Sequence, residues 1–393
     1  MRLIIRPLLF AGAGLVVLYF SFIGLLTIPF LQSEVIYLNS IAQTWFQDLN
    51  IPEQWGFLHN QVTPFQLTTE DGEKLHAWHI LPLELYRRHE DQLIQEEPGL
   101  VGDITQRLGF HLLRDDPSSL LVLYFHGAGG TLASGFRPPS YRALYAGAPD
   151  KIHIVAIDYR GFGSSTGLPS EEGLLIDAIT LVEWAMKEAG IPSSRIVLFA
   201  QSLGTAVAIS LAHHLAIQPE PVLFSGVVLV APFVNVEYLT ATYRIAGVIP
   251  LLDPIARFPY LLSFFNRFIV SKWPNRDRLA HFVQICERIQ SGTARNYHII
   301  LIHAQDDYDI PWSHSQELFW HAVNASLPDE TGYEEFRKEK ETSTINLEAA
   351  GWNARRETKG GVLQLEVPKY GLHDRIMSYH IVSLAVFRAF NRI

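Results

Sequence analysis

The chain has 393 residues, of which 48% are hydrophobic and 18% are charged, and its formal net charge is -9. This composition is too apolar for a disordered chain, and its acidic balance does not favour nucleic-acid binding. The single cysteine, Cys286, permits no internal disulfide and no cysteine metal cluster. The sequence therefore describes a folded and somewhat lipophilic protein.

An uncharged, strongly apolar run covers residues 8–31 and is long enough to span a bilayer as one helix. Arg2 and Arg6 precede the run, whereas the first charges after it are acidic. The positive-inside rule then places the N-terminus in the cytosol and the rest of the chain on the lumenal or exterior side. We predict an uncleaved transmembrane anchor, with a cleaved signal peptide as the alternative. The expected membrane is that of the endoplasmic reticulum, where the sequon at Asn324 would make the protein a glycoprotein.

Short apolar runs begin near residue 60 and alternate with helical patterns as far as the C-terminus. This alternation predicts a mostly parallel sheet of eight strands with helices on both faces, a fold of the α/β class. The first two strands form a hairpin over 61–81, and irregular surface insertions are expected over 83–119 and 328–359. The other strands are expected at 120–125, 152–157, 196–199, 226–231, 298–303 and 362–367, and a final helix at 375–390.

A serine, Ser202, lies in a predicted turn between a strand and a helix, in the run Ala200-Gln201-Ser202-Leu203-Gly204. The residues two before and two after it are small, as they must be where a strand and a helix approach each other around a strained turn. This pattern is typical of a nucleophile elbow and predicts that Ser202 attacks the substrate. It departs from G-x-S-x-G at Ala200, and an ordinary turn serine is the alternative.

A glycine-rich turn, HGAGG at 126–130, follows the strand at 120–125. Backbone N–H groups that are exposed at the end of a parallel strand are what an oxyanion hole requires. We predict that Ala128 and Leu203 supply the two N–H donors. A phosphate-binding turn is the alternative, but neither G-x-G-x-x-G nor a Walker lysine follows.

Five segments occur in a fixed order along the chain: HGAGG, DYRGFGSSTG, AQSLG, HAQDDYDIP and GLHD. Together they resemble the α/β-hydrolase superfamily and, within it, the membrane-anchored abhydrolase-domain monoacylglycerol and lysophospholipid lipases. The resemblance implies that Asp307 is the acid of a catalytic triad, with Asp306 as the alternative, and that His373 is the general base. The order Ser202, Asp307, His373 along the chain is the one that this superfamily uses.

A long apolar and aromatic stretch at about 233–290 interrupts the strand pattern, at the point where this fold inserts its cap. The hydrolase domain is expected to span 60–393, with the cap inside it. One helical stripe in the cap has the spacing i, i+3, i+4, i+7, and it is either a roof over an acyl chain or packing onto the core. The stripe comprises Leu261, Phe264, Phe265 and Phe268.

These features predict a membrane-anchored serine hydrolase that cleaves carboxylic esters of single-chain lipids through an acyl-enzyme on Ser202. Its partners would be the lipid substrate and the membrane, with no nucleic acid, and no metal or organic cofactor is expected. Within enzymes, the alternatives are a protein acyl-thioesterase (a depalmitoylase) and a serine peptidase of the same fold. A catalytically silent membrane scaffold is the alternative from another class.

Overall fold

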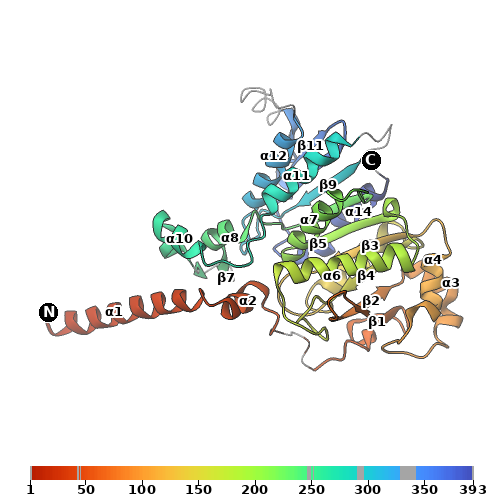
Figure 1. The fold of residues 1–393 in the computed structure, drawn as a ribbon, viewed down its shortest axis with the longest axis horizontal. Coiled ribbons are helices and arrows are strands. Elements are labelled where there is room, and N and C mark those ends of the chain that lie inside the picture. The colour runs from red at the N-terminus through yellow and green to blue at the C-terminus, as the bar shows by residue number, and fades with distance from the viewer. Residues whose placement is uncertain are drawn as a thin grey trace.

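A mixed sheet forms the centre of the fold and, within the described residues, has ten strands in the order β1-β2-β4-β3-β5-β6-β9-β12-β11-β10 (Figure 1). The computed structural model describes residues 2–41, 44, 46–245, 249–250, 252–289, 296–327 and 342–391. The pairings from β4 to β12 are parallel, whereas the strands at both edges pair antiparallel. The strands are β1 (Val62–Thr68), β2 (Lys74–Ile80), β3 (Leu120–Phe125), β4 (Ile152–Ile157), β5 (Ile196–Gln201), β6 (Gly226–Val230), β9 (Tyr297–Ile302), β10 (Thr344–Asn346), β11 (Gly351–Glu357) and β12 (Gly361–Pro368).

The sequence predicts eight strands, and all eight are present within a residue or two of their expected positions. The predicted number is nevertheless wrong, because β10 and β11 come from the segment 328–359, which was expected to be irregular. Strand β11 buries Ala354 but exposes Arg355 and Glu357. These charged side chains hide the strand signal in the sequence.

Buried side chains fill both faces of the sheet, because successive residues of a strand point to opposite sides. On one face, Leu121 and Leu123 of β3 pack beneath α6 (Glu171–Glu183), α7 (Leu203–Ala216), α11 (Asn275–Arg288) and α12 (Ser313–Ala325). On the other face, Val122 and Tyr124 pack beneath α5 (Arg137–Leu144) and α14 (His380–Asn391). Helices on both faces of a largely parallel sheet are the predicted architecture, which is confirmed. The final helix is shorter than expected, because a 3₁₀ turn over Arg375–Ser378 precedes α14.

The segment 83–119 contains two helices rather than the predicted irregular loop. They are α3 (Leu83–Leu93) and α4 (Leu108–Arg114). Leu85, Tyr86 and Leu93 of α3 form a small buried cluster of their own beside the main core. Most other positions of α3 are charged or polar, so the apolar positions are too few for the sequence pattern to predict a helix.

The chain between β6 and α11 forms a small group of helices at one side of the sheet (Figure 1). It contains α8 (Val236–Thr242), a short hairpin of β7 (Arg244–Ile245) and β8 (Ile249–Pro250), α9 (Asp253–Ala256) and α10 (Pro259–Asn266). Helix α11, which lies in the same predicted insertion, instead packs against α7 and α12. The extent of the cap therefore stays a prediction.

The N-terminal segment consists of α1 (Arg2–Leu25), which extends away from the body of the molecule in Figure 1, and α2 (Pro29–Tyr37). Among the described residues, length and hydropathy qualify no individual helix as a membrane span; Val16–Leu25 and Pro29–Tyr37 qualify only as a pair, which is bent by 93°. The segment 8–31 is divided between these two helices, and the membrane anchor stays a prediction.

Candidate active site

Ser202 lies at the sharp turn between β5 and α7, with backbone angles φ 51° and ψ -119°. A serine seldom adopts a positive φ, so the surrounding packing must hold the turn in this strained conformation. A Cβ atom on Gly204 would lie 2.1 Å from the carbonyl oxygen of Phe125 in β3, so only glycine fits there. Ala200, the departure from G-x-S-x-G, is fully buried in the cluster beneath α7.

Three side chains that the sequence singled out meet at the carboxyl ends of their strands. Ser202 follows β5, Asp307 follows β9 and His373 follows β12. The Nε2 atom of His373 lies 3.0 Å from the Ser202 hydroxyl oxygen, and its Nδ1 atom lies 2.8 Å from Oδ2 of Asp307. When Nδ1–H donates to the carboxylate, Nε2 is free to accept the serine proton, which is the arrangement that general-base activation needs.

The carboxylate of Asp307 accepts hydrogen bonds at both oxygens. Oδ1 accepts from the backbone N–H groups of Asp309 and Ile310, each at 3.0 Å. Oδ2 contacts His303 Nε2 at 3.1 Å in addition to His373. Burial favours the neutral acid, but the charge of His373 and the hydrogen bond from His303 outweigh it and hold the pKa of Asp307 well below its usual range. Asp307 therefore stays ionised at neutral pH.

Asp306, the alternative acid, has a different contact. Its Oδ1 accepts the backbone N–H of Leu372 at 2.8 Å, which ties the loop of Asp306 to the loop of His373. The structure thus brings Asp307, and not Asp306, to the imidazole ring.

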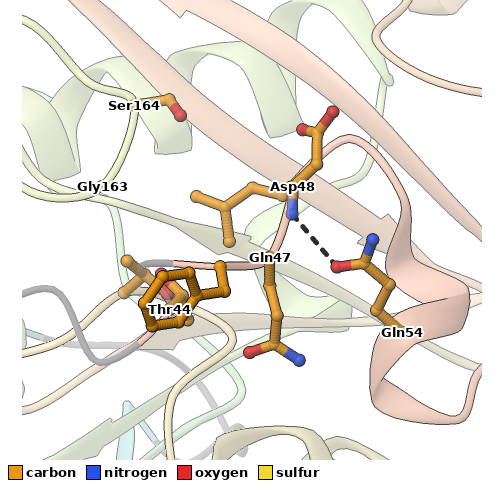
Figure 2. A pocket seen from close by; sticks show the side chains of 9 residues that line it. Thr44, Gln47, Asp48, Gln54, Gly163 and Ser164 are labelled. Atoms are coloured by element: carbon orange, nitrogen blue, oxygen red, sulfur yellow. Dashed lines mark hydrogen bonds between the residues drawn. The ribbon is translucent and has the colours of Figure 1, made fainter.

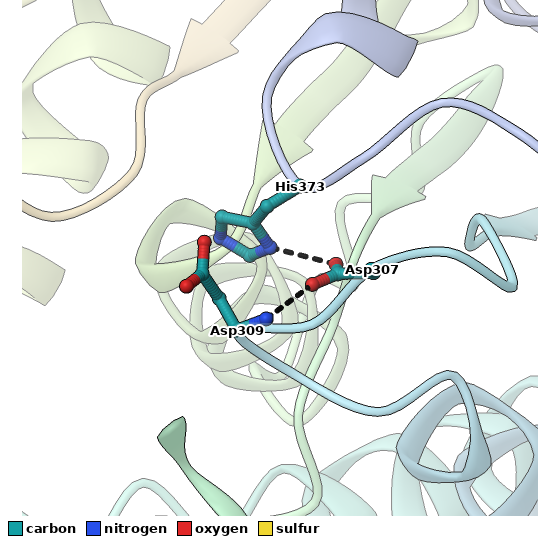
Figure 3. Close-up of side chains that lie close together, drawn as sticks. All are labelled: Asp307, Asp309 and His373. Atoms are coloured by element: carbon teal, nitrogen blue, oxygen red, sulfur yellow. Dashed lines mark hydrogen bonds and ion pairs between the residues drawn. The ribbon is translucent and has the colours of Figure 1, made fainter. Parts of the chain in front are cut away.

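Acidic groups surround the imidazole of His373, whose side chain is 14% exposed. Burial lowers the pKa of this histidine, but Asp307, followed by Asp374 and Asp309, outweighs burial and raises the pKa to about 9. Figure 3 shows the Asp309 carboxylate beside the ring, on the side away from Asp307. Asp307, Asp309 and His373 offer ligand atoms within 4.8 Å of one another, but a cation there would compete with the Asp307–His373 hydrogen bond.

The turn at 126–130, here called the oxyanion loop, lies directly against the elbow. A Cβ atom on Gly127 would be 3.2 Å from Cβ of Ser202. The N–H groups of Gly129 and Gly130 are already engaged, because they donate to the carbonyls of Tyr37 and Ile41. Among the described residues, the N–H groups of Ala128 and Leu203 donate to no other group. The two predicted donors are therefore available to a ligand.

A buried arginine holds the carbonyl side of the oxyanion loop. The Arg137 guanidinium donates to the carbonyls of Gly127 at 2.9 Å, Ala128 at 3.3 Å and Gly129 at 2.8 Å. Its second terminal nitrogen donates to the carbonyl of Thr131. Fixing these carbonyls also fixes the direction of the N–H groups of the same peptides. Arg137 has no sequence motif that would have revealed this contact.

Sequence reasoning also missed contributions from two residues near the triad. The sequence patterns single out neither residue, yet His303 contacts the acid and Asp309 faces the base. His303 Nδ1 in turn contacts the Ser315 hydroxyl at 2.7 Å, which fixes its ring. The only available signal was the closeness of these residues to Asp307 in the sequence.

The predicted roof residues lie together on and just after α10. Phe264 packs edge-on against Phe265 and Phe268, with ring centroids 5.4 and 5.5 Å apart. Phe264 and Phe268 are exposed, Leu261 and Phe265 are partly buried, and none of the four belongs to a buried core cluster. The stripe therefore presents an apolar surface and does not pack into the core.

A cavity of about 560 Å³ opens elsewhere on the surface, near the end of the oxyanion loop (Figure 2). Its wall is largely polar, and Gln54 accepts a hydrogen bond from the backbone of Asp48 across it. None of the predicted site residues lines it. The lining residues are Thr44, Phe46, Gln47, Asp48, Leu49, Gln54, Thr131, Gly163 and Ser164.

This fold, with a serine elbow, a facing histidine and a glycine-rich loop, defines a hydrolase of the α/β class. Residues 121–330 match the Alpha/beta hydrolase family, and the chain belongs to that family. The predicted fold class is thereby confirmed.

Relatives of this chain include lysophosphatidylserine lipase ABHD12 of Rattus norvegicus, which is 26% identical over 74% of this chain and 63% of its own length. Protein ABHD12B of Homo sapiens is 29% identical over 74% of this chain and 69% of its own length. The chain thus spans slightly less than two thirds of the rat relative. The predicted resemblance to the abhydrolase-domain lipases is confirmed.

A solved structure supports the fold independently. An alpha-beta hydrolase from Vibrio vulnificus superposes with a TM-score of 0.51, at 15% identity, over 92% of each chain. A likeness at this identity bears on the fold alone.

Proposed function

We propose that this protein is a serine hydrolase that cleaves the carboxylic ester of single-chain lipids, namely lysophospholipids or monoacylglycerols. The observation that carries the proposal is the continuous contact from the Ser202 hydroxyl through His373 to Asp307, at 3.0 and 2.8 Å. The relatives named lysophosphatidylserine lipase support the substrate class.

The reaction follows from the positions of these groups. His373 takes the hydroxyl proton as Ser202 attacks the ester carbonyl, and Asp307 stabilises the imidazolium that forms. The N–H groups of Ala128 and Leu203 stabilise the negative oxygen, a contribution of about 3 kcal/mol per donor. His373 then protonates the leaving alcohol, and water activated by the same histidine releases the fatty acid from Ser202.

The acyl chain would lie along the apolar surface of the cap. Phe264 and Phe268 expose their rings on α10 and its end. A lipid with one chain can withdraw partway from a bilayer and cover such a surface, whereas a second or third chain requires further apolar surface. Single-chain lipids are therefore the substrates that we expect to be cleaved fastest.

The nucleophile is tested by Ser202→Ala, with Ser164→Ala, an exposed serine of another loop, as the matched control. Ser202→Ala should abolish labelling by a fluorophosphonate and lower kcat by at least about a thousand-fold, because it removes the hydroxyl that contacts His373. Ser164→Ala should behave as the wild type. Full labelling of the Ser202→Ala protein would refute the assignment.

A substrate panel distinguishes the proposed function from its alternatives. It contains a lysophosphatidylserine, a monoacylglycerol, a triacylglycerol and an S-palmitoyl peptide, each offered to the detergent-solubilised full chain. We expect the two single-chain lipids to be hydrolysed fastest. A preference for the thioester would favour a depalmitoylase, and a wild type that neither labels nor hydrolyses any of the four would favour a silent scaffold.

The proposal includes a membrane anchor at residues 8–31 in the endoplasmic reticulum, with the catalytic domain in the lumen. The charge asymmetry around this run supports it, and Asn324 is exposed on α12, where a glycan can be added. Protease added to sealed microsomes should spare the domain, and a glycosidase shift should be lost in Asn324→Gln. Digestion without detergent would mean that the domain faces the cytosol.

A further inference from the structure

The ten residues that follow the bend of the N-terminal helix pair contact both the cap and the oxyanion loop. We call residues 32–41 the N-terminal strap; it contains most of α2 and the turn after it. Its two sets of contacts involve segments that lie about ninety and more than two hundred residues further along the chain.

The first set of contacts joins the strap to the chain that leaves α10. The Gln32 side chain, which is 8% exposed, donates to the carbonyl of Phe268 at 3.1 Å and accepts the N–H of Val270 at 2.7 Å. One amide therefore satisfies a backbone acceptor and a backbone donor of the cap exit. The buried Tyr37 adds a hydrogen bond from its hydroxyl to the Ser271 hydroxyl at 2.9 Å.

The second set of contacts joins the strap to the oxyanion loop. The carbonyl of Tyr37 accepts the N–H of Gly129, and the carbonyl of Ile41 accepts the N–H of Gly130, both at 2.8 Å. Buried N–H groups without such acceptors would be costly, so these two bonds hold the loop against the strap. Within the oxyanion loop only Ala128 is partly exposed, and its N–H donates to no described group.

The oxyanion loop is consequently held from two sides. Arg137 binds its carbonyls and the strap binds the N–H groups of its two last glycines. Without the strap, Gly129 and Gly130, at φ +67° and +68°, would lose their acceptors, and glycine without a Cβ can adopt many other backbone conformations. The peptide that carries the Ala128 N–H is adjacent and would move with them.

We propose that the N-terminal strap is a positioning element of the active site, which holds the Ala128 N–H in place and ties the oxyanion loop to the exit of the cap. The inference rests on the proposed function for its effect on catalysis. The strap directly follows the predicted anchor, so a displacement of the N-terminal helix pair would move both the oxyanion loop and the cap exit, which the strap contacts.

The test uses two strap variants and one control in the full-length chain. Leu38 lies between Tyr37 and Ile41, whose carbonyls bind the oxyanion loop, and it has φ 52°. Because proline is restricted to φ of about -65°, Leu38→Pro should displace these carbonyls. Gln32→Ala removes the amide that binds the cap exit. Val35→Ala is the control, since Val35 is exposed on the same helix.

Hydrogen–deuterium exchange provides a readout that requires no activity. In Leu38→Pro, the amides of Gly129 and Gly130 should exchange at least about ten-fold faster than in the wild type, because their acceptors are displaced. In Gln32→Ala, the faster exchange should appear at Val270. Val35→Ala should leave both regions unchanged.

Kinetics on a water-soluble acetate ester provide the second readout. Leu38→Pro should lower kcat by roughly ten-fold or more with little change in KM, since loss of an oxyanion donor acts on the transition state. Unchanged exchange and unchanged kcat in a folded Leu38→Pro protein would overturn the proposal. If that variant does not fold, unchanged exchange at residues 268–271 in Gln32→Ala overturns it instead. An inactive wild type would refute the proposed function, while the exchange measurements would still decide the role of the strap.

Discussion

His373 has a carboxylate at each side of its ring, and the two carboxylates are not equivalent. Asp307 is buried and bonded to Nδ1 at 2.8 Å. Asp309 is partly buried and lies on the other side of the ring (Figure 3). Both stabilise the protonated imidazole, so the histidine is a stronger base than usual and is protonated over a wider range of pH.

This environment predicts an alkaline pH profile. Only the neutral imidazole accepts the serine proton, so kcat/KM should rise with pH as His373, whose pKa is raised to about 9, loses its proton. Asp309→Asn removes one negative charge beside the ring, lowers the pKa of His373, and should move this limb to lower pH by about one pH unit. The measurement is kcat/KM on a soluble ester between about pH 6 and pH 10. Asp277→Asn, an exposed position on α11, should leave the profile unchanged.

Candidate residues could be singled out from the sequence where the local chemistry is specific. Ser202 has small residues two positions before and two positions after it, and Gly204 faces the backbone of β3 too closely for a side chain. This pattern of residue sizes can be recognised in the sequence. His303 and Arg137 could not be recognised in this way. Their roles depend on contacts with loops elsewhere in the fold, and a lone histidine or arginine has no spacing that reveals such contacts.

Two aromatic rings that the sequence singled out are exposed on α10 and just after it. Phe264 and Phe268 are 49% and 43% exposed and touch each other, although burying such rings against lipid would be favourable by about 1.5 to 3 kcal/mol each. Exposed aromatic surface of this kind is typical of a site that binds a lipid or another apolar partner.

The double variant Phe264→Asp with Phe268→Asp tests this element. It should raise KM for a long-chain monoacylglycerol by about five-fold or more, since the acyl chain loses apolar contact, and leave KM for an acetate ester nearly unchanged. Leu384→Asp, on the exposed side of α14, is the matched control for an added charge. Equal losses on both esters would mean that the stripe supports the fold and does not bind the acyl chain.

Strands and helices differed in how well the sequence predicted them. The buried parallel strands are continuous apolar runs, which made their positions predictable to within a residue or two. Helix α3 and strand β11 were missed because charged and polar residues outnumber the apolar ones in both sequences. The break between α1 and α2 was missed as well, since hydropathy does not register where a helix bends.

At the scale of the whole molecule, the sequence predicted the order of the functional parts but not the contacts between distant parts. The alternation of strands and helices placed the serine, the acid and the histidine at one edge of the sheet. Nothing in residues 32–41 indicated that they contact residues 129–130 and 268–271. Such contacts depend on side-chain fit across long stretches of chain, and sequence periodicity carries no information about them.

The N-terminal strap also joins segments that are made far apart in time during synthesis of the chain. Tyr37 is made 234 residues before Ser271, and Gln32 is made 236 residues before Phe268. Closing so long a loop costs chain entropy, which is offset only when both partners of each contact have been made. In a growing chain the oxyanion loop can bind the strap before residues 268–271 are made. The contacts that join the strap to both the oxyanion loop and the cap exit are therefore complete only late in translation. His373 is made later still, so the chain acquires its complete candidate active site only near the end of its synthesis.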